Sequence, residues 1–185
     1  MRSRSNAALF WPVLLAILLV DLVTKAIAER ELLRGIPQEV LGNALRLRLV
    51  YNPGAAFGLD LGPQSRWIFA ALTIGALVIL ARLYRSTHAG HAARVAALAL
   101  VCAGAVGNLI DRVRSFFGVV DFIDVGIGDA RWPTFNVADM AVSIGAGLLA
   151  WVLWQEDQST QGTASAVSPV PVSASASGGE PGDLV

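Results

Sequence analysis

Long apolar stretches, separated by polar segments, dominate the chain up to about residue 154. A helix needs about 20 mostly apolar residues to cross a bilayer. Four stretches meet this requirement, at about residues 9–28, 67–84, 92–111 and 135–154. The first carries Asp21 and Lys25 and has no clear cleavage site after it, so we expect a retained span and not a signal peptide. The pattern therefore predicts a bundle of four membrane-spanning helices.

The segments between the spans differ in length and pattern. Residues 85–91 are enough only for a tight connection, whereas residues 29–66 contain NALRLRLVYN, in which polar and apolar positions alternate as in a half-buried strand. A second candidate strand, FFGVVDFIDVGIG, lies within residues 112–134. We therefore expect an all-α membrane protein, a four-transmembrane-helix bundle with a small β-sheet lying on the membrane surface.

The composition changes after Trp154. Residues 159–185 consist mainly of Ser, Ala, Gly, Pro and Val and contain no basic residue, which is typical of disorder. We predict a membrane domain over residues 1–158 and a disordered C-terminal tail over residues 159–185.

The overall composition limits the kinds of protein this chain can be. Hydrophobic residues make up 55% of it and charged residues 15%, against about 25% charged residues in a soluble domain, which argues against a soluble domain. The formal net charge is zero, which provides no basic field for nucleic acid. The single cysteine, Cys102, excludes an intrachain disulfide and a cysteine-based metal cluster, and we expect neither a cofactor nor a metal.

An even number of antiparallel spans places both termini on one side of the membrane. The end of the first span, the start of the second, the end of the third and the start of the fourth then share the other side. Arginines flank the short 85–91 connection without an acidic residue, which favours cytoplasmic termini under the positive-inside rule. The connections on the other side contain more arginines, but long folded loops are weaker reporters under that rule.

Polar and ionisable side chains gather at that second interface, although such residues are costly in lipid. They are Asp21 and Lys25 in the first span, Asn108, Asp111 and Arg112 at the end of the third, Asp121 and Asp124 in the following connection, and Asn136 and Asp139 at the start of the fourth. Each group also has a purely structural explanation. Asp21 and Lys25 can form an ion pair, and Asp111 with Arg112 can cap the third helix. Asn136 can be an N-cap with Asp139 favoured by the helix dipole, and Asp124 and Asp129 can be solvated loop carboxylates. Charges kept for structure alone would be spread over both interfaces, so their gathering at one favours a functional site.

The chemistry open to this interface is that of carboxylates. Cys102 lies among apolar residues in the third span, which disfavours a thiolate, and Ser143 has no histidine within reach. His88 and His91 lie on the opposite side, where we expect them to face solvent. A pair of carboxylates sharing one proton can hydrolyse an amide, because the ionised group activates water while the protonated group donates to the carbonyl oxygen and then to the leaving amine.

Five short motifs occur in order along the chain. They are Asp21-Leu-Val-Thr-Lys25, Asn52-Pro-Gly-Ala-Ala-Phe-Gly58, Gly104-Ala-Val-Gly-Asn108-Leu-Ile-Asp111-Arg112, Val119-Val-Asp121-Phe-Ile123 and Phe135-Asn136-Val-Ala-Asp139. Together they make residues 8–154 resemble bacterial lipoprotein signal peptidase, the signal peptidase II family.

The resemblance implies an intramembrane aspartic endopeptidase that cuts prolipoproteins before a cysteine carrying a diacylglyceryl group. It implies a catalytic pair at Asp121 and Asp139. The supporting positions that it implies are Asp21, Lys25, Asn52, Gly54, Asn108, Asp111, Arg112 and Asn136. It also implies a location in the bacterial inner membrane, with cytoplasmic termini and with the sheet and active site at the extracytoplasmic face. The implied partners are lipid-modified prolipoproteins, membrane lipids and globomycin-type cyclic peptide inhibitors.

The residues suggest how the two carboxylates divide the work. We expect Asp139, near a helix N-terminus, to ionise more easily than Asp121, in an apolar strand, which makes Asp139 the initial base and Asp121 the initial acid. Coupled carboxylates nevertheless titrate as a pair. Asn52 and Gly54 lie in a turn whose glycine lets a peptide backbone approach closely.

Two other functions are compatible with the sequence. A proton- or ion-coupled transporter also uses buried Asp, Lys and Arg, although its sites usually lie near the membrane midplane between repeats. A non-catalytic assembly subunit would keep its activity after Asp121→Asn or Asp139→Asn.

Overall fold

The computed structural model describes residues 6–54 and 62–166. The chain divides into two units, Met1–Val152 and Leu153–Val185, and the arrangement described below is that of the first unit. The rest of the NPGAAFG motif after Gly54 lies outside the described residues, as does the chain after Ala166.

Long apolar helices make up most of the described chain. They are α1 (Asn6–Glu31), α2 (Ser65–Arg85), α3 (Ala92–Arg114) and α4 (Val137–Ala166). Each is long and apolar enough to cross a membrane, α4 over its part Val137–Gln158. The predicted fold class, four apolar helices with a small sheet, is confirmed.

The expected tail and its boundary stay predictions. α4 continues past Ser159 to Ala166, and no proline interrupts it before Pro169. The remainder of the expected tail lies outside the described residues.

α3 is the central helix of the bundle, and its small residues let the neighbouring helices approach closely. Phe10 and Leu14 of α1 pack against Val95, Leu98 and Cys102 of α3 in a buried apolar core. Further along α3, a Cβ on Gly104 would collide with the Ala138 carbonyl oxygen of α4, and one on Gly107 with the Asp21 carboxylate of α1. Small residues that permit such backbone approach are typical of helix contacts in membranes.

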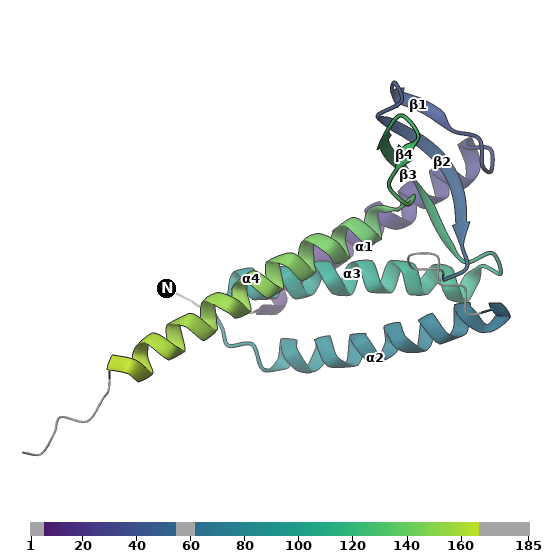
Figure 1. Cartoon of the computed structure of the whole chain (residues 1–185). Coiled ribbons are helices and arrows are strands. Elements are labelled where there is room, and N and C mark those ends of the chain that lie inside the picture. Colours follow the sequence, from purple (N-terminus) through teal and green to yellow (C-terminus); the bar gives the residue numbers. More distant parts are fainter. Residues whose placement is uncertain (1–5, 55–61, 167–185) are drawn as a thin grey trace, which may run out of the picture. The chain divides into compact units, whose positions relative to one another are not determined.

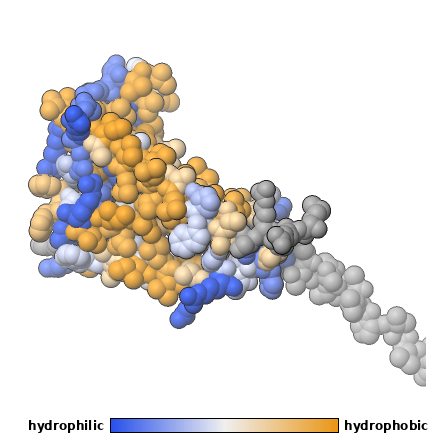
Figure 2. Space-filling view, turned by 180° about the vertical axis from the view of Figure 1, so that it is seen from behind, coloured by the Kyte–Doolittle hydropathy of each residue, from blue (hydrophilic) through white to orange (hydrophobic). Residues whose placement is uncertain are grey.

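The outer surface of the helices is apolar, as a bilayer requires. Leu19, Leu72 and Ile79 are 62%, 62% and 67% exposed. Figure 2 shows a broad apolar area over the helices, with hydrophilic side chains gathered at the end that carries the sheet. A surface of this kind is solvated by lipid and not by water.

The sheet is antiparallel with the strand order β1-β2-β3-β4. Its strands are β1 (Gln38–Leu41), β2 (Leu45–Asn52), β3 (Val119–Ile127) and β4 (Ala130–Arg131). It lies at the end of the bundle that holds the ends of α1 and α3 and the starts of α2 and α4 (Figure 1).

Strand alternation decides which side chains of β3 meet the helices. Val120 and Phe122 pack on Ala28 and Leu32 at the end of α1. Because successive strand residues point to opposite faces, Asp121 between them points the other way, toward the start of α4.

The prediction that Asp124 is a solvated loop carboxylate is wrong, because Asp124 is buried in β3. Its side chain is only 3% exposed, and it accepts hydrogen bonds from Arg46 Nε and Nη2 at 2.9 and 2.7 Å and from Arg131 Nε at 2.8 Å. The β2–β3 register sets Arg46 directly opposite Asp124, and the β3–β4 hairpin returns Arg131 to it. Burial alone would raise the pKa of Asp124, but the bonds from Arg131 and Arg46 outweigh it and lower that pKa. Asp129 is exposed, as expected.

Candidate active site

A buried lysine lies at the centre of the polar cluster. Lys25 Nζ is 2.8 Å from Asp21 Oδ2 and 2.9 Å from Asp111 Oδ2, and all three side chains are fully buried. The ion pair expected between Asp21 and Lys25 is therefore present, and Asp111 joins it from α3. An isolated charge at such depth would be very unfavourable, so the three groups depend on one another.

The two carboxylates of this cluster also bind backbone groups of other elements. Asp21 Oδ1 accepts a hydrogen bond from the Ala138 N–H at 2.9 Å, and Asp111 Oδ2 accepts one from the Val120 N–H at 3.3 Å. Asp111 Oδ1 accepts a hydrogen bond from Arg114 Nε at 2.9 Å. The arginine partner of Asp111 is therefore Arg114, whereas the expected helix cap paired Asp111 with Arg112. The cluster thus joins α1, α3, the start of α4 and β3.

The side-chain amide of Asn108 connects the lysine cluster to Asp139 by hydrogen bonds. Lys25 Nζ donates to Asn108 Oδ1 at 2.9 Å, and Asn108 Nδ2 donates to Asp139 Oδ1 at 2.7 Å. An ammonium has donors only, so it must face the amide oxygen, which leaves the amide nitrogen to face Asp139. Lys25 therefore decides which way Asn108 presents its amide.

Asn136 connects the two candidate catalytic carboxylates from the other side. Its Nδ2 lies 3.1 Å from Asn108 Oδ1 and 2.7 Å from Asp121 Oδ1. Its Oδ1 accepts from the Asp139 N–H at 2.9 Å, while Asp139 Oδ2 accepts from the Asn136 N–H at 3.2 Å. This reciprocal pair is a capping box at the start of α4. The expected N-cap is present, and the same bonds hold Asp139 in place.

Asp121 is held by β2 as well as by Asn136. Asn52 Nδ2 donates to Asp121 Oδ2 at 3.2 Å, and Asn52 Oδ1 accepts from the Gly54 N–H at 3.0 Å. Gly54 has a φ of +119°, and a Cβ there would collide with the Phe69 ring, so a residue with a side chain would be strained. Burial, followed by the charge of Asp139, raises the pKa of Asp121 to about 7.

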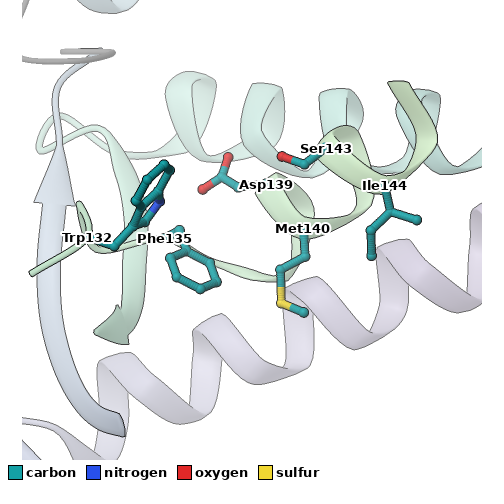
Figure 3. A pocket seen from close by; sticks show the side chains of 6 residues that line it. All are labelled: Trp132, Phe135, Asp139, Met140, Ser143 and Ile144. Atoms are coloured by element: carbon teal, nitrogen blue, oxygen red, sulfur yellow. The ribbon is translucent and has the colours of Figure 1, made fainter. Parts of the chain in front are cut away.

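Asp121 and Asp139 line one cleft of about 280 Å³. The other residues that line it are Asn52, Gly54, Phe69, Arg112, Trp132, Pro133, Thr134, Phe135 and Ser143. A second pocket, of about 350 Å³, adjoins Asp139, which lies between Trp132 and Ser143 in Figure 3. A concave site with a few convergent polar groups is the usual form of a substrate-binding site.

Arg112 belongs to the cleft and not to the lysine cluster. Its Nη1 donates to the Asn108 carbonyl oxygen at 3.2 Å, and its guanidinium carbon lies 5.9 Å from the centre of the Phe69 ring. Its buried Nε has no hydrogen-bond partner within the part of the chain that the structure describes. The guanidinium therefore retains donor capacity at the wall of the cleft.

All ten site residues named from the sequence lie at this one end of the bundle, either in the cleft or in the network beneath it. Sequence analysis missed the aromatic walls, Phe69 from α2 and Trp132 before α4. Phe69 looks like any other apolar residue of a span. The Trp132-Pro133 pair is separated from the last motif only by Thr134, but nothing in its local pattern distinguishes it from a loop.

A bundle of apolar helices with two carboxylates facing one cleft is typical of a membrane-embedded aspartic peptidase. The family model for signal peptidase (SPase) II matches residues 13–155. The chain belongs to the signal peptidase II family, a family of aspartic-type peptidases.

Relatives and solved structures agree with this membership. The lipoprotein signal peptidase of Janthinobacterium sp. (strain Marseille) is 41% identical over 153 residues, which cover 80% of this chain and 90% of the relative. That of Hydrogenovibrio crunogenus is 45% identical over 139 residues, covering 72% and 77%. A bacterial membrane enzyme solved by the in meso method at 2.3 Å resolution matches with a TM-score of 0.75 and 31% identity, over 85% of this chain and 94% of that one.

These relatives identify the chain as a multi-pass bacterial membrane protein of the peptidase class. They give no support to the alternative of a transporter.

Replacing the buried ammonium tests the role of the lysine cluster. Lys25→Met leaves Asp21 and Asp111 buried without their cation, and we expect the free energy of unfolding to fall by about 3–5 kcal/mol. Unfolding in detergent micelles measures this loss. Arg30→Met, at an 85% exposed ion pair on the same helix, is the matched control and should change little. Equal stability of the two variants would show that the buried cluster does not hold the fold together.

Proposed function

We propose that this chain removes signal peptides from prolipoproteins by cutting before the lipidated cysteine, with Asp121 and Asp139 as the catalytic pair. The observation that carries the proposal is that both carboxylates line one cleft and are linked through the amides of Asn108 and Asn136. Such fixed donors restrict how the two acidic groups can move relative to one another, and fixed placement of reacting groups is what catalysis of amide hydrolysis requires.

The environments of the two carboxylates favour different starting roles. A pKa of about 7 keeps a proton on a large share of Asp121 at neutral pH, which suits the initial acid. Asp139 lies in the first turn of α4, where the helix dipole favours a negative charge, and this suits the initial base.

In this mechanism a water molecule between the two groups attacks the scissile carbonyl carbon. Asp139 takes the proton of that water while the Asp121 proton passes to the carbonyl oxygen. When the tetrahedral intermediate collapses, the carbon–nitrogen bond breaks, the leaving amine takes the proton held by Asp139, and one hydroxyl of the intermediate returns a proton to Asp121 as the new carboxyl group forms. Both protons are thus accounted for by the two carboxyl groups and the water.

Other residues of the cleft are suited to holding the substrate. The Arg112 guanidinium can donate to a peptide carbonyl or to a lipid oxygen, and the turn at Asn52 and Gly54 lets an extended peptide approach. Membrane lipids surround the helices, and globomycin-type cyclic peptides would inhibit by occupying this cleft.

The proposed orientation has both termini in the cytoplasm and the sheet and cleft at the extracytoplasmic face of the inner membrane. It is supported by the 85–91 connection, which arginines flank and which lies at the end of the helices opposite the sheet (Figure 1).

Replacing either carboxylate by its amide should stop cleavage. Asp121→Asn and Asp139→Asn keep the shape of the side chain but remove the acid or the base, and we expect the rate to fall by at least about 10²–10⁴-fold. Cleavage of a diacylglyceryl-modified precursor by the purified variants measures this. Asp129→Asn, at an exposed loop position, should cleave normally. Full activity of either site variant would favour the non-catalytic assembly subunit.

The proton on Asp121 should make the rate depend on pH. Because its pKa is raised to about 7, the acid form is lost above that pH, and kcat/KM should fall on the alkaline side. The hydrogen bond from Asn52 lowers this pKa, so Asn52→Ala should move the alkaline limb to higher pH, whereas Asp129→Asn should leave it in place. A limb that stays fixed, or moves to lower pH, in Asn52→Ala would contradict the role of Asp121 as acid.

Labelling of single cysteines tests the orientation. In a Cys102→Ser background, Ala130→Cys in the sheet should react with an impermeant maleimide added to intact spheroplasts. Ala89→Cys in the short connection should react only after permeabilisation. The reverse pattern would invert the proposed topology.

A further inference from the structure

An apolar groove begins at Asp139 and follows one face of α4. It has a volume of about 350 Å³ and is lined by Trp132, Phe135, Met140, Ser143 and Ile144 in addition to Asp139. Figure 3 shows Trp132 and Phe135 on one side of Asp139, with Met140 and Ile144 projecting together from α4. Trp132, Phe135, Asp139 and Ser143 also line the polar cleft, so the groove and the cleft are direct neighbours.

The groove borders the polar cleft and also reaches the outer, lipid-facing surface of α4. Met140 and Ile144 are 43% and 59% exposed, and their i,i+4 spacing puts them on one face of α4. Ile144 lies about 7.5 Å along the helix from Asp139, at 1.5 Å per residue. This face therefore leads from the candidate catalytic carboxylate into the part of α4 that can span the membrane.

We infer that this groove holds an acyl chain of the diacylglyceryl group on the substrate cysteine, an inference that rests on the proposed function. The cut falls next to the lipidated cysteine, so its acyl chains must start close to Asp139. Among the pockets described above, this one combines an apolar lining with contact to Asp139. An acyl chain that follows it stays among apolar groups while its glyceryl end reaches the polar cleft.

The lining of the groove suits an acyl chain. Met140 and Ile144 form an apolar strip along one face of α4 beside Asp139, and Trp132 and Phe135 add aromatic surface. A hydrocarbon chain is thin enough to lie along Met140 and Ile144 and gains close packing there.

This assignment gives the substrate a direction in the cleft. The lipidated cysteine, which carries the leaving amine, lies on the α4 side. The signal peptide then leaves along the other wall, past Phe69 of α2 and Arg112 of α3.

Narrowing the groove should discriminate between substrates by acyl length. We compare precursors of one peptide sequence that carry dipalmitoylglyceryl or dihexanoylglyceryl groups. Ile144→Trp should raise KM for the dipalmitoyl precursor roughly tenfold, the size of effect expected from a poorly fitting apolar group, with little change for the dihexanoyl precursor. Ile79→Trp, the same substitution at a 67% exposed position of α2, should leave both unchanged.

The other outcomes of this assay overturn the inference. The groove does not bind the acyl chain if Ile144→Trp changes KM equally for both precursors. The same conclusion follows if Ile144→Trp and Ile79→Trp have the same KM values. The peptidase function would still stand, because the wild-type protein cuts both precursors. Failure of the wild-type protein to cut either precursor would instead refute the proposed function.

Photocrosslinking tests the same inference without hydrolysis and without a substitution in the groove. A precursor with a diazirine on its acyl chain, bound to the uncleaving Asp121→Asn variant, should label α4 around Met140 and Ile144. Labelling confined to α1 or α2 overturns the inference. So does labelling of α4 by a diazirine phospholipid that unlabelled precursor does not displace, because the groove would then hold a membrane lipid.

Discussion

The buried ammonium of Lys25 is the interaction on which the rest of the site depends. It lies between Asp21 and Asp111, each of which also accepts a backbone N–H, one from the start of α4 and one from β3. Burying three charges is costly unless every one is paired and hydrogen-bonded. The start of α4 and the start of β3 are therefore tied to the same point, and these two elements carry Asp139 and Asp121.

The two asparagine side chains turn this structural cluster into an ordered site. The Asn108 side chain accepts a hydrogen bond from Lys25 and donates one to Asp139. Asn136 caps α4 and donates a hydrogen bond to Asp121. Capping and catalysis are therefore not competing explanations for these residues. The same hydrogen bonds that begin a helix also fix a carboxylate, because an N-terminal turn has free N–H groups to bind it.

Much of the fold could be predicted because its signals are local. A span shows itself as a continuous apolar run, and the site residues showed themselves because charges in such runs are rare. The partners could not be predicted in the same way. Asp124 looked like a loop carboxylate, yet strand pairing places Arg46 opposite it, and Phe69 becomes part of the cleft only when α2 packs beside the turn at Gly54.

The sequence by itself determined the four helices, the end of the bundle where polar groups gather and the residues of the five motifs, because hydropathy and helical spacing act over a few turns. Only the tertiary structure decided that Asp111 pairs with Lys25 and Arg114, that Arg112 faces the cleft, and that an apolar groove adjoins Asp139. These contacts form between side chains from different elements, which come together only in the folded chain. A buried charge must be paired, and the tertiary packing determines which partner is close enough.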